Sequence, residues 1–112
     1  MYVPDRCHVV WLQFNPQTGH EQAGHRPALV LSPATYNGKT GLALFCPITN
    51  QIKGYPFEVK IKDNPTISGV VLADQVKNLD WRVRGVKFVT MVDETLLEEV
   101  LSKFEALIRM NE

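Results

Sequence analysis

Short hydrophobic runs recur along the first 91 residues, and Gly, Pro, Asn or Asp residues separate them. The runs lie at 8–14, 28–32, 42–48, 56–62, 69–73 and 86–91 and are rich in Val, Ile, Leu and Phe. Short apolar runs between turn-forming residues are typical of β-strands. The pattern therefore predicts a strand in each of the runs.

Two dipeptides that end in glycine lie between the second and third runs. Asn37-Gly38 is followed closely by Thr40-Gly41, and an Asn-Gly pair tolerates the positive backbone angles of a tight reversal. We therefore predict a β-hairpin over residues 28–48.

The hydrophobic period changes after Asp93. Apolar residues now recur at three- and four-residue steps, as on one face of a helix; they are Leu96, Leu97, Val100, Leu101, Phe104, Leu107 and Ile108. The carboxylate of Asp93 suits a helix N-cap. Several short strands and one terminal helix predict a mainly β protein, in which a small, strongly bent sheet or partly open barrel is capped by the helix.

Length and composition favour one folded domain over residues 1–112. Hydrophobic residues make up 45% of the chain and charged residues 21%, which is ordinary for a soluble protein. No apolar run approaches the roughly 20 residues that cross a bilayer. The N-terminal stretch lacks the basic and then apolar order of a signal peptide. We expect a cytoplasmic protein without a membrane partner.

The distribution of cysteines, histidines and charged residues indicates which kinds of site and partner to expect. Cys7 and Cys46 have no CxxC spacing, so we expect two buried thiols, and the histidine spacings match no metal-ligand pattern. We expect no metal and no cofactor. Residues 1–92 carry ten Lys and Arg against six Asp and Glu, whereas residues 93–112 carry two against six. The basic excess of the body is compatible with a polyanionic partner.

The stretch GHEQAGHRPALVLSP, residues 19–33, places several proton-handling groups before a strand. The guanidinium of Arg26 could hold a phosphate or form an ion pair that pins the loop. Glu21 could act as a general base if burial raised its pKa, or remain a solvated loop residue. His25 suits proton transfer, a structural role or a nucleic-acid contact, and His20 suits a contact.

Several separated motifs resemble one family, the MazF/PemK/Kid toxin endoribonucleases. They are EQAGHRPALVLSP (21–33), YNGKTG (36–41), CPITNQIKGYPFEV (46–59) and GVVLADQVKNLDWRVRG (69–85). The resemblance implies a compact SH3-like antiparallel β-barrel that works as a homodimer. It also implies metal-independent cleavage of single-stranded RNA at short sequences, and inhibition by a MazE-like antitoxin whose disordered, largely acidic end covers the RNA-binding surface.

The resemblance also implies roles for individual residues. Arg26 and Thr49 match catalytic positions of the family, and Glu21 matches an acidic position implicated in activity. Asp74 matches a position that is catalytic in some relatives, but those relatives have an arginine two residues earlier, where this chain has Leu72. Asp74 and His25 are therefore predicted to be either catalytic or RNA-contacting.

Polar, aromatic and basic side chains that can hold unstacked bases complete the predicted site. The RNA-binding candidates are His20, Lys53, Tyr55, Gln75 and Lys77. Trp11 and Trp81 are interpreted as core or interface aromatics. Two other functions remain open: a CcdB-like poison of DNA gyrase on a related fold, and an RNA-binding module that has lost catalysis.

Overall fold

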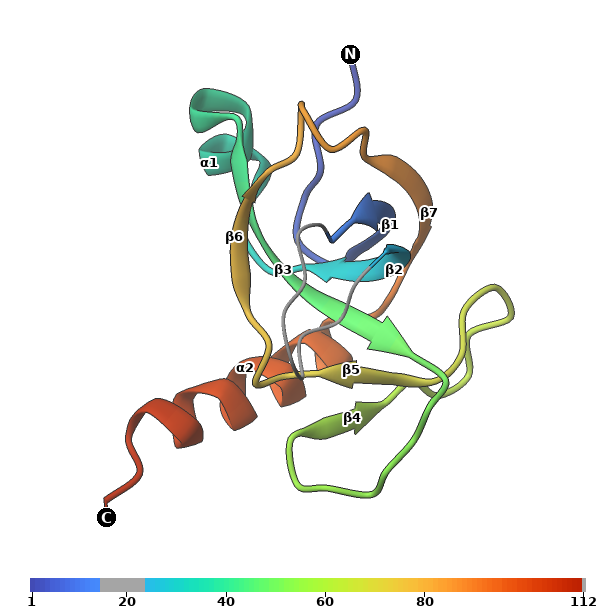
Figure 1. Cartoon of the computed structure of the whole chain (residues 1–112), viewed down its shortest axis with the longest axis vertical. Coiled ribbons are helices and arrows are strands. Elements are labelled where there is room, and N and C mark those ends of the chain that lie inside the picture. Colours follow the sequence, from blue (N-terminus) through green and yellow to red (C-terminus); the bar gives the residue numbers. More distant parts are fainter. Residues whose placement is uncertain (15–23, 112) are drawn as a thin grey trace.

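The computed structural model describes residues 1–14 and 24–111, which form seven strands and two helices in the order ββαβββββα. The elements are β1 (His8–Gln13), β2 (His25–Val30), α1 (Ala34–Thr40), β3 (Leu42–Thr49), β4 (Glu58–Lys60), β5 (Val70–Leu72), β6 (Lys77–Asp80), β7 (Lys87–Met91) and α2 (Glu94–Ile108). Figure 1 shows a strongly bent sheet with α2 packed beneath it.

The strands form one antiparallel sheet in the order β4-β5-β3-β2-β1-β7, with β6 as a further partner of β3. β3 is the centre of this arrangement because it pairs with three strands. β2 pairs along its middle, β6 pairs with its first half and β5 with its last two residues. This sharing of β3 bends the sheet (Figure 1).

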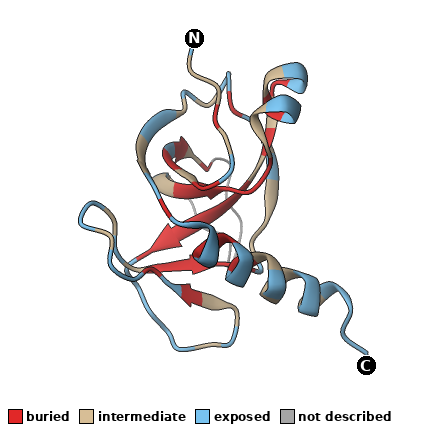
Figure 2. Ribbon diagram, turned by 180° about the vertical axis from the view of Figure 1, so that it is seen from behind, coloured by how far each residue is buried: buried red, intermediate tan, exposed pale blue. Residues whose placement is uncertain are grey.

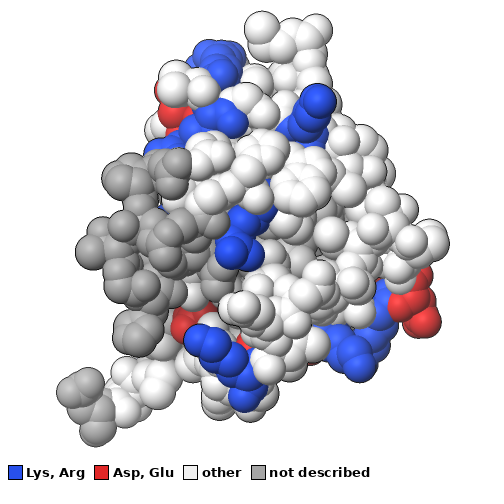
Figure 3. All heavy atoms as spheres, turned by 45° about the vertical axis from the view of Figure 1, so that its right-hand side comes forward, with Lys and Arg blue, Asp and Glu red and all other residues white. Residues whose placement is uncertain are grey.

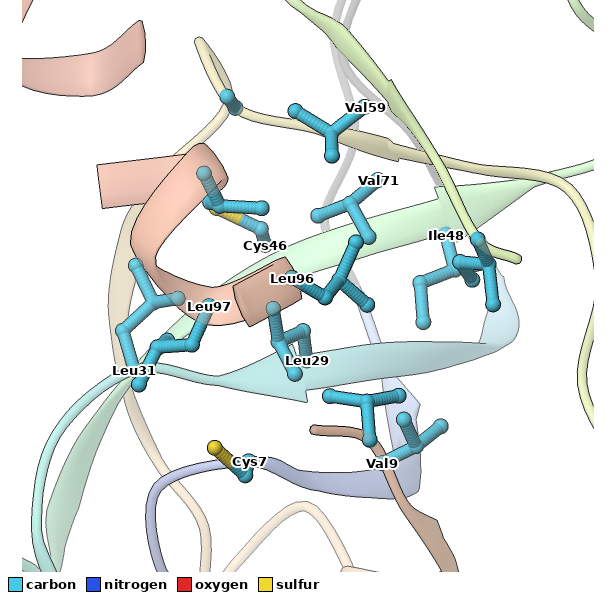
Figure 4. Close-up of a cluster of buried hydrophobic side chains, with 14 residues drawn as sticks. Cys7, Val9, Leu29, Leu31, Cys46, Ile48, Val59, Val71, Leu96 and Leu97 are labelled. Carbon is cyan, nitrogen blue, oxygen red and sulfur yellow. The ribbon is translucent and has the colours of Figure 1, made fainter. Parts of the chain in front are cut away.

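Alternating side chains on the strands supply two separate apolar clusters. The first cluster includes Val9, Leu29 and Ile48 together with side chains from α2, and Figure 4 shows these residues converging between the sheet and the helix. The second cluster lies on the other face of the same strands and includes Leu12 and Phe45. Figure 2 shows buried residues concentrated in the central strands. The sheet is therefore covered on both faces near its centre.

The C-terminal helix confirms the change of period at residue 93. The carboxylate of Asp93 accepts a hydrogen bond of 3.0 Å from the backbone N–H of Leu96, as expected of an N-cap. Leu96, Leu97 and Val100 are buried against the sheet. The far end of the predicted stripe is not covered in the same way, since Ile108 is 65% exposed. Only the first half of the helix therefore serves the core.

The predicted tight turn at Asn37-Gly38 is wrong, although β2 and β3 pair as a hairpin would. The connection is helix α1, and the positive backbone angle belongs to its C-cap, Gly41, with φ +76°. Asn37 is fully buried inside this helix. Its Nδ2 donates to the carbonyl oxygens of Pro4 and Ser32 at 2.7 and 3.0 Å. These tertiary hydrogen bonds outweigh the local turn preference of Asn-Gly.

The mainly β fold with a terminal helix is confirmed, and every predicted run contains a strand or part of one. The hydrogen-bonded order does not close into a ring within the described residues, so the sheet is a bent, open form of the expected barrel. Strand β6 was not predicted, because its alternation of Lys, Asn, Leu and Asp is short and polar. In the described parts of the chain, no helix is long and apolar enough to cross a membrane.

Candidate functional site

A pocket opens beyond the end of β3 and brings together residues from two stretches of the chain, 49–58 and 72–75. Its volume is about 450 Å³, which is within the range of small-ligand sites. The lining residues are Thr49, Gln51, Lys53, Tyr55, Glu58, Leu72, Asp74 and Gln75. Five of the residues predicted from the sequence, Thr49, Lys53, Tyr55, Asp74 and Gln75, therefore meet in one pocket.

Strand register places Arg26 at the level of Thr49. β2 and β3 pair with Ala28 opposite Pro47, and the same register continued by two residues brings Arg26 opposite Thr49. Because side chains alternate along strands, both residues lie on the face of the sheet that carries the second apolar cluster. Arg26 is half-buried there and pairs with Leu12 of β1.

Lys77 belongs to the same face of the sheet. It pairs with Phe45 of β3, and Leu79 on the same side of β6 packs against the second apolar cluster. Where that cluster ends, polar side chains continue along the same face: Arg26 on β2, Thr49 on β3 and Lys77 on β6. The strands thus direct two cations and a hydroxyl toward one region.

Thr49 forms part of the pocket floor, with an exposed fraction of 5%. Its Oγ1 accepts a hydrogen bond of 3.1 Å from the backbone N–H of Gln51. A hydroxyl has two acceptor lone pairs and one proton, so this bond leaves the proton able to reach an acceptor in the pocket. Gly69 lies directly against Thr49, because a Cβ added at Gly69 would overlap the Thr49 carbonyl oxygen.

A hydrogen bond links Tyr55 and Asp74 across the pocket. The Tyr55 hydroxyl donates to Oδ1 of Asp74 at 3.0 Å, and Gln75 hydrogen-bonds to the same tyrosine. Burial, followed by the bond to Asp74, raises the pKa of Tyr55 to about 12. The tyrosine therefore remains a neutral donor at physiological pH, and Asp74 fixes its position. Asp74 therefore positions Tyr55 in this structure. This role agrees with the sequence, because the arginine that lies two residues before the catalytic aspartate of some relatives is replaced by Leu72 in this chain.

The second carboxylate of the pocket is also engaged by the protein. Oε2 and Oε1 of Glu58 accept hydrogen bonds from the backbone N–H groups of Lys53 and Gly54 at 2.8 and 2.9 Å. Figure 3 shows Lys and Arg side chains spread over one face of the molecule, with fewer acidic groups visible among them. Such a surface favours a polyanion over a cationic ligand.

His25 takes a different position from its neighbour Arg26. Consecutive strand residues point to opposite faces, and the His25 ring stacks on Trp11 with centroids 5.4 Å apart and planes within 7°. His25 lines a second, more open hollow with Arg84 and Gly85. The structure thus separates His25 from the Thr49 pocket. Trp81 is 4% exposed, which confirms a core position, whereas Trp11 is 39% exposed.

Two predicted residues, Glu21 and His20, lie outside the described residues. Within residues 1–14 and 24–111, His, Cys, Asp and Glu side chains do not gather in groups of three that could hold a metal ion. Cys7 and Cys46 are buried free thiols, as predicted, and burial raises the pKa of the Cys46 thiol to about 12.

The sequence interpretation missed three pocket residues: Gln51, Glu58 and Leu72. The alternation of Gln51, Lys53 and Tyr55 along one extended segment was a usable signal, because residues two apart share a side. Glu58 and Leu72 are directly opposite each other in the β4–β5 pair, so only knowledge of strand pairing could have brought them to the pocket.

Comparison with known proteins agrees with this architecture. The family model described as PemK-like, MazF-like toxin of type II toxin-antitoxin system matches residues 5–108. The chain is 50% identical over 107 residues to the endoribonuclease toxin MazF of Escherichia coli K12, and the match covers 96% of each protein.

Solved structures give the same result. The crystal structure of MazF from Deinococcus radiodurans superposes with a TM-score of 0.93 at 54% identity, covering 98% of this chain and all of the other. A MazE–MazF crystal structure from the same organism superposes with a TM-score of 0.85 at 48% identity, covering 99% of this chain and all of the other. The resemblance inferred from the separated motifs is confirmed: this chain belongs to the family of PemK-like, MazF-like toxins of type II toxin–antitoxin systems.

Proposed function

We propose that this chain is a sequence-specific, metal-independent endoribonuclease toxin that cleaves single-stranded RNA. The observation that carries the proposal is the meeting of Thr49, Lys53, Tyr55 and Gln75 in one pocket, at the level of Arg26 along the strand register. The nearly full-length likeness to endoribonuclease toxins supports it. The whole of residues 1–112 forms the toxin domain.

The reaction uses the 2′-hydroxyl of the RNA as its nucleophile. The 2′-oxygen attacks the adjacent phosphorus, its proton passes to a base, and the bond from phosphorus to the 5′-oxygen breaks while that oxygen takes up a proton. The products are a 2′,3′-cyclic phosphate and a 5′-hydroxyl. Arg26 stabilises the charge that develops on the phosphate oxygens, since a guanidinium can donate two parallel hydrogen bonds. The Thr49 hydroxyl, on the pocket floor, donates a hydrogen bond to the phosphate.

Glu21 is proposed as the acidic catalytic residue from the family resemblance, and His20 as an RNA contact from its residue type, since both lie outside the described residues. Lys53, Tyr55, Gln75 and Lys77 bind the RNA strand, with Tyr55 offering an aromatic face and Lys53 a positive charge. We assign His25 to RNA contact, because it faces away from Arg26 along β2.

The proposed biological setting follows the family. The toxin acts as a homodimer in the cytoplasm and is inhibited by a MazE-like antitoxin, in keeping with the MazE–MazF complexes of a similar protein. An acidic antitoxin segment and RNA both suit the basic excess of residues 1–92. Light scattering at micromolar concentration should give twice the chain mass, and a stable monomer would contradict the proposed homodimer.

The proposal is tested by the chemistry of the cut ends. Purified protein is incubated with a long unstructured RNA in excess EDTA, and the new termini are identified by their reactivity toward kinase and phosphatase. A 2′,3′-cyclic phosphate and a 5′-hydroxyl are expected. A 5′-phosphate, or loss of cleavage in EDTA, would contradict the mechanism. A parallel gyrase supercoiling assay detects the alternative, a gyrase poison, which would leave RNA intact.

A further inference from the structure

Residues 50–57 form the loop between β3 and β4, called the β3–β4 loop below, and this loop builds one wall of the pocket. Gln51, Lys53 and Tyr55 of the loop all line the cavity. The segment has no strand or helix of its own. The positions of these side chains therefore depend on contacts between the loop and other parts of the protein.

Glu58 supplies the inner contact. Both of its carboxylate oxygens are used, one for the N–H of Lys53 and the other for the N–H of Gly54, at 2.8 and 2.9 Å. Gly54 has φ +81°, and a left-handed residue of this kind makes successive N–H groups converge on one anion. Because Glu58 is itself the first residue of β4, the carboxylate fastens the loop to the sheet.

Lys103 supplies an outer contact from the other end of the chain. Its Nζ donates a hydrogen bond of 2.6 Å to the carbonyl oxygen of Pro56, 47 residues away in the sequence. The helix that carries Lys103 is anchored in the core through Leu96, Leu97 and Val100. The β3–β4 loop is thus held between the first residue of β4 and the core helix.

We propose that Glu58 and Lys103 are positioning residues for RNA binding, which hold the β3–β4 loop so that Lys53 and Tyr55 face the strand bound beside Thr49. The inference rests on the proposed function and extends it to residues outside the reacting centre. Glu58 acts through the backbone of Lys53 and Gly54, and its charge is met by those N–H groups. A loosened loop weakens RNA binding while Arg26 and Thr49 retain their strand positions, so KM changes and kcat does not.

The test compares Glu58→Gln with Glu99→Gln, which makes the same chemical change at an exposed position of α2. In Glu58→Gln the amide NH₂ meets a backbone donor, so one of the two loop contacts is lost. On a short oligonucleotide that contains the sequence cut by the wild type, KM should rise about tenfold and kcat should stay within about threefold. Lys103→Met should also raise KM, by about threefold. Glu99→Gln should have the KM and kcat of the wild type.

Two further measurements separate positioning from general destabilisation. Affinity for a 2′-deoxy analogue, which lacks the attacking hydroxyl, should fall with the rise in KM. Amide exchange at Lys53 and Gly54 should accelerate in Glu58→Gln, while the Ala73 N–H, which bonds to the Phe57 carbonyl at 2.9 Å, keeps its protection. If Glu58→Gln fails to fold, Lys103→Met gives the same readouts from the outer contact.

The outcomes are distinguishable. Folded variants with unchanged KM and unchanged exchange at Lys53 and Gly54 would overturn the positioning role, as would a fall in kcat at constant KM. If the wild type left RNA intact, the proposed endoribonuclease function would fail instead, and amide exchange would still decide whether Glu58 and Lys103 hold the loop.

Discussion

Gly69 tests whether the backbone around Thr49 is as tightly packed as the structure indicates. Gly69 has φ +107°, a conformation that other residues adopt at a cost of about 1–3 kcal/mol. A Cβ at this position would overlap the Thr49 carbonyl oxygen and lie 2.8 Å from Oδ1 of Asn50. Because the Thr49 carbonyl oxygen belongs to the backbone, the overlap can be relieved only if β3 moves at the pocket floor. Overpacking of this kind adds about 1–3 kcal/mol.

Gly69→Ala should therefore lower the free energy of unfolding by about 4 kcal/mol. In a domain of this length, 1 kcal/mol moves Tm by about 4 °C, so the melting temperature should fall by about 15 °C. Gly85→Ala is the matched control, because Gly85 also has a positive φ, +64°, but a Cβ there meets nothing within 4 Å. It should cost only the backbone strain, about 1–2 kcal/mol.

Urea unfolding and thermal melting measure both variants, and RNA cleavage is compared at a temperature where each is folded. Gly69→Ala should lose cleavage about tenfold beyond its loss of folded protein, because Thr49 is displaced. Equal destabilisation of Gly69→Ala and Gly85→Ala would refute the packing argument. Full cleavage by folded Gly69→Ala would refute the part assigned to Thr49.

Three further predictions concern side chains with defined partners. Burial lowers the pKa of His8 below 6.5, so the contribution of the neutral ring to stability is complete above that pH and is lost as the pH falls below it. Between about pH 7.5 and 5.5, the free energy of urea unfolding should therefore fall less in His8→Phe than in the wild type. Asn37→Ala, which removes the buried hydrogen bonds to Pro4 and Ser32, should cost about 3 kcal/mol in urea unfolding without changing cleavage per folded molecule. Tyr55→Phe removes the donor to Asp74 and should raise KM about fivefold in the oligonucleotide assay; an unchanged KM would remove Tyr55 from the RNA site.

The predicted role of His8 follows from its local geometry. Nδ1 lies 2.7 Å from the Tyr2 hydroxyl oxygen and accepts from the N–H of Asp5 at 3.3 Å. A backbone N–H can only donate, so Nδ1 is the unprotonated nitrogen and the tyrosine hydroxyl donates to it. A second proton on the ring would face two donors, which is why acidification is expected to destabilise this corner of the fold.

Periodicity predicted the elements whose burial follows it. The strands around Val9, Leu29 and Phe45 and the helix after Asp93 alternate or repeat in step with the faces that they bury. Helix α1 was not predicted because its buried residue is polar. Asn37 donates a hydrogen bond to Pro4, 33 residues away in the sequence, and a local hydrophobic pattern does not reveal such a contact.

The pocket was predictable only in part, for the same reason. Thr49 was identified by family resemblance, and Lys53 and Tyr55 by residue type. The part played by Glu58 depends on two backbone N–H groups in a loop, and the opposite directions of His25 and Arg26 depend on strand alternation. Both facts belong to backbone geometry, which a list of reactive side chains does not contain.

The most direct test of the catalytic role of Arg26 is sequence-resolved digestion of a long unstructured RNA by the wild type, Arg26→Ala and Arg6→Ala. Arg6 is an exposed arginine outside the pocket. Cuts clustered at one short sequence are expected in the wild type and in Arg6→Ala, with a loss of at least about 100-fold in folded Arg26→Ala. Intact RNA with folded wild-type protein would contradict the proposed endoribonuclease function, and equal cleavage by Arg26→Ala would contradict the catalytic role of Arg26.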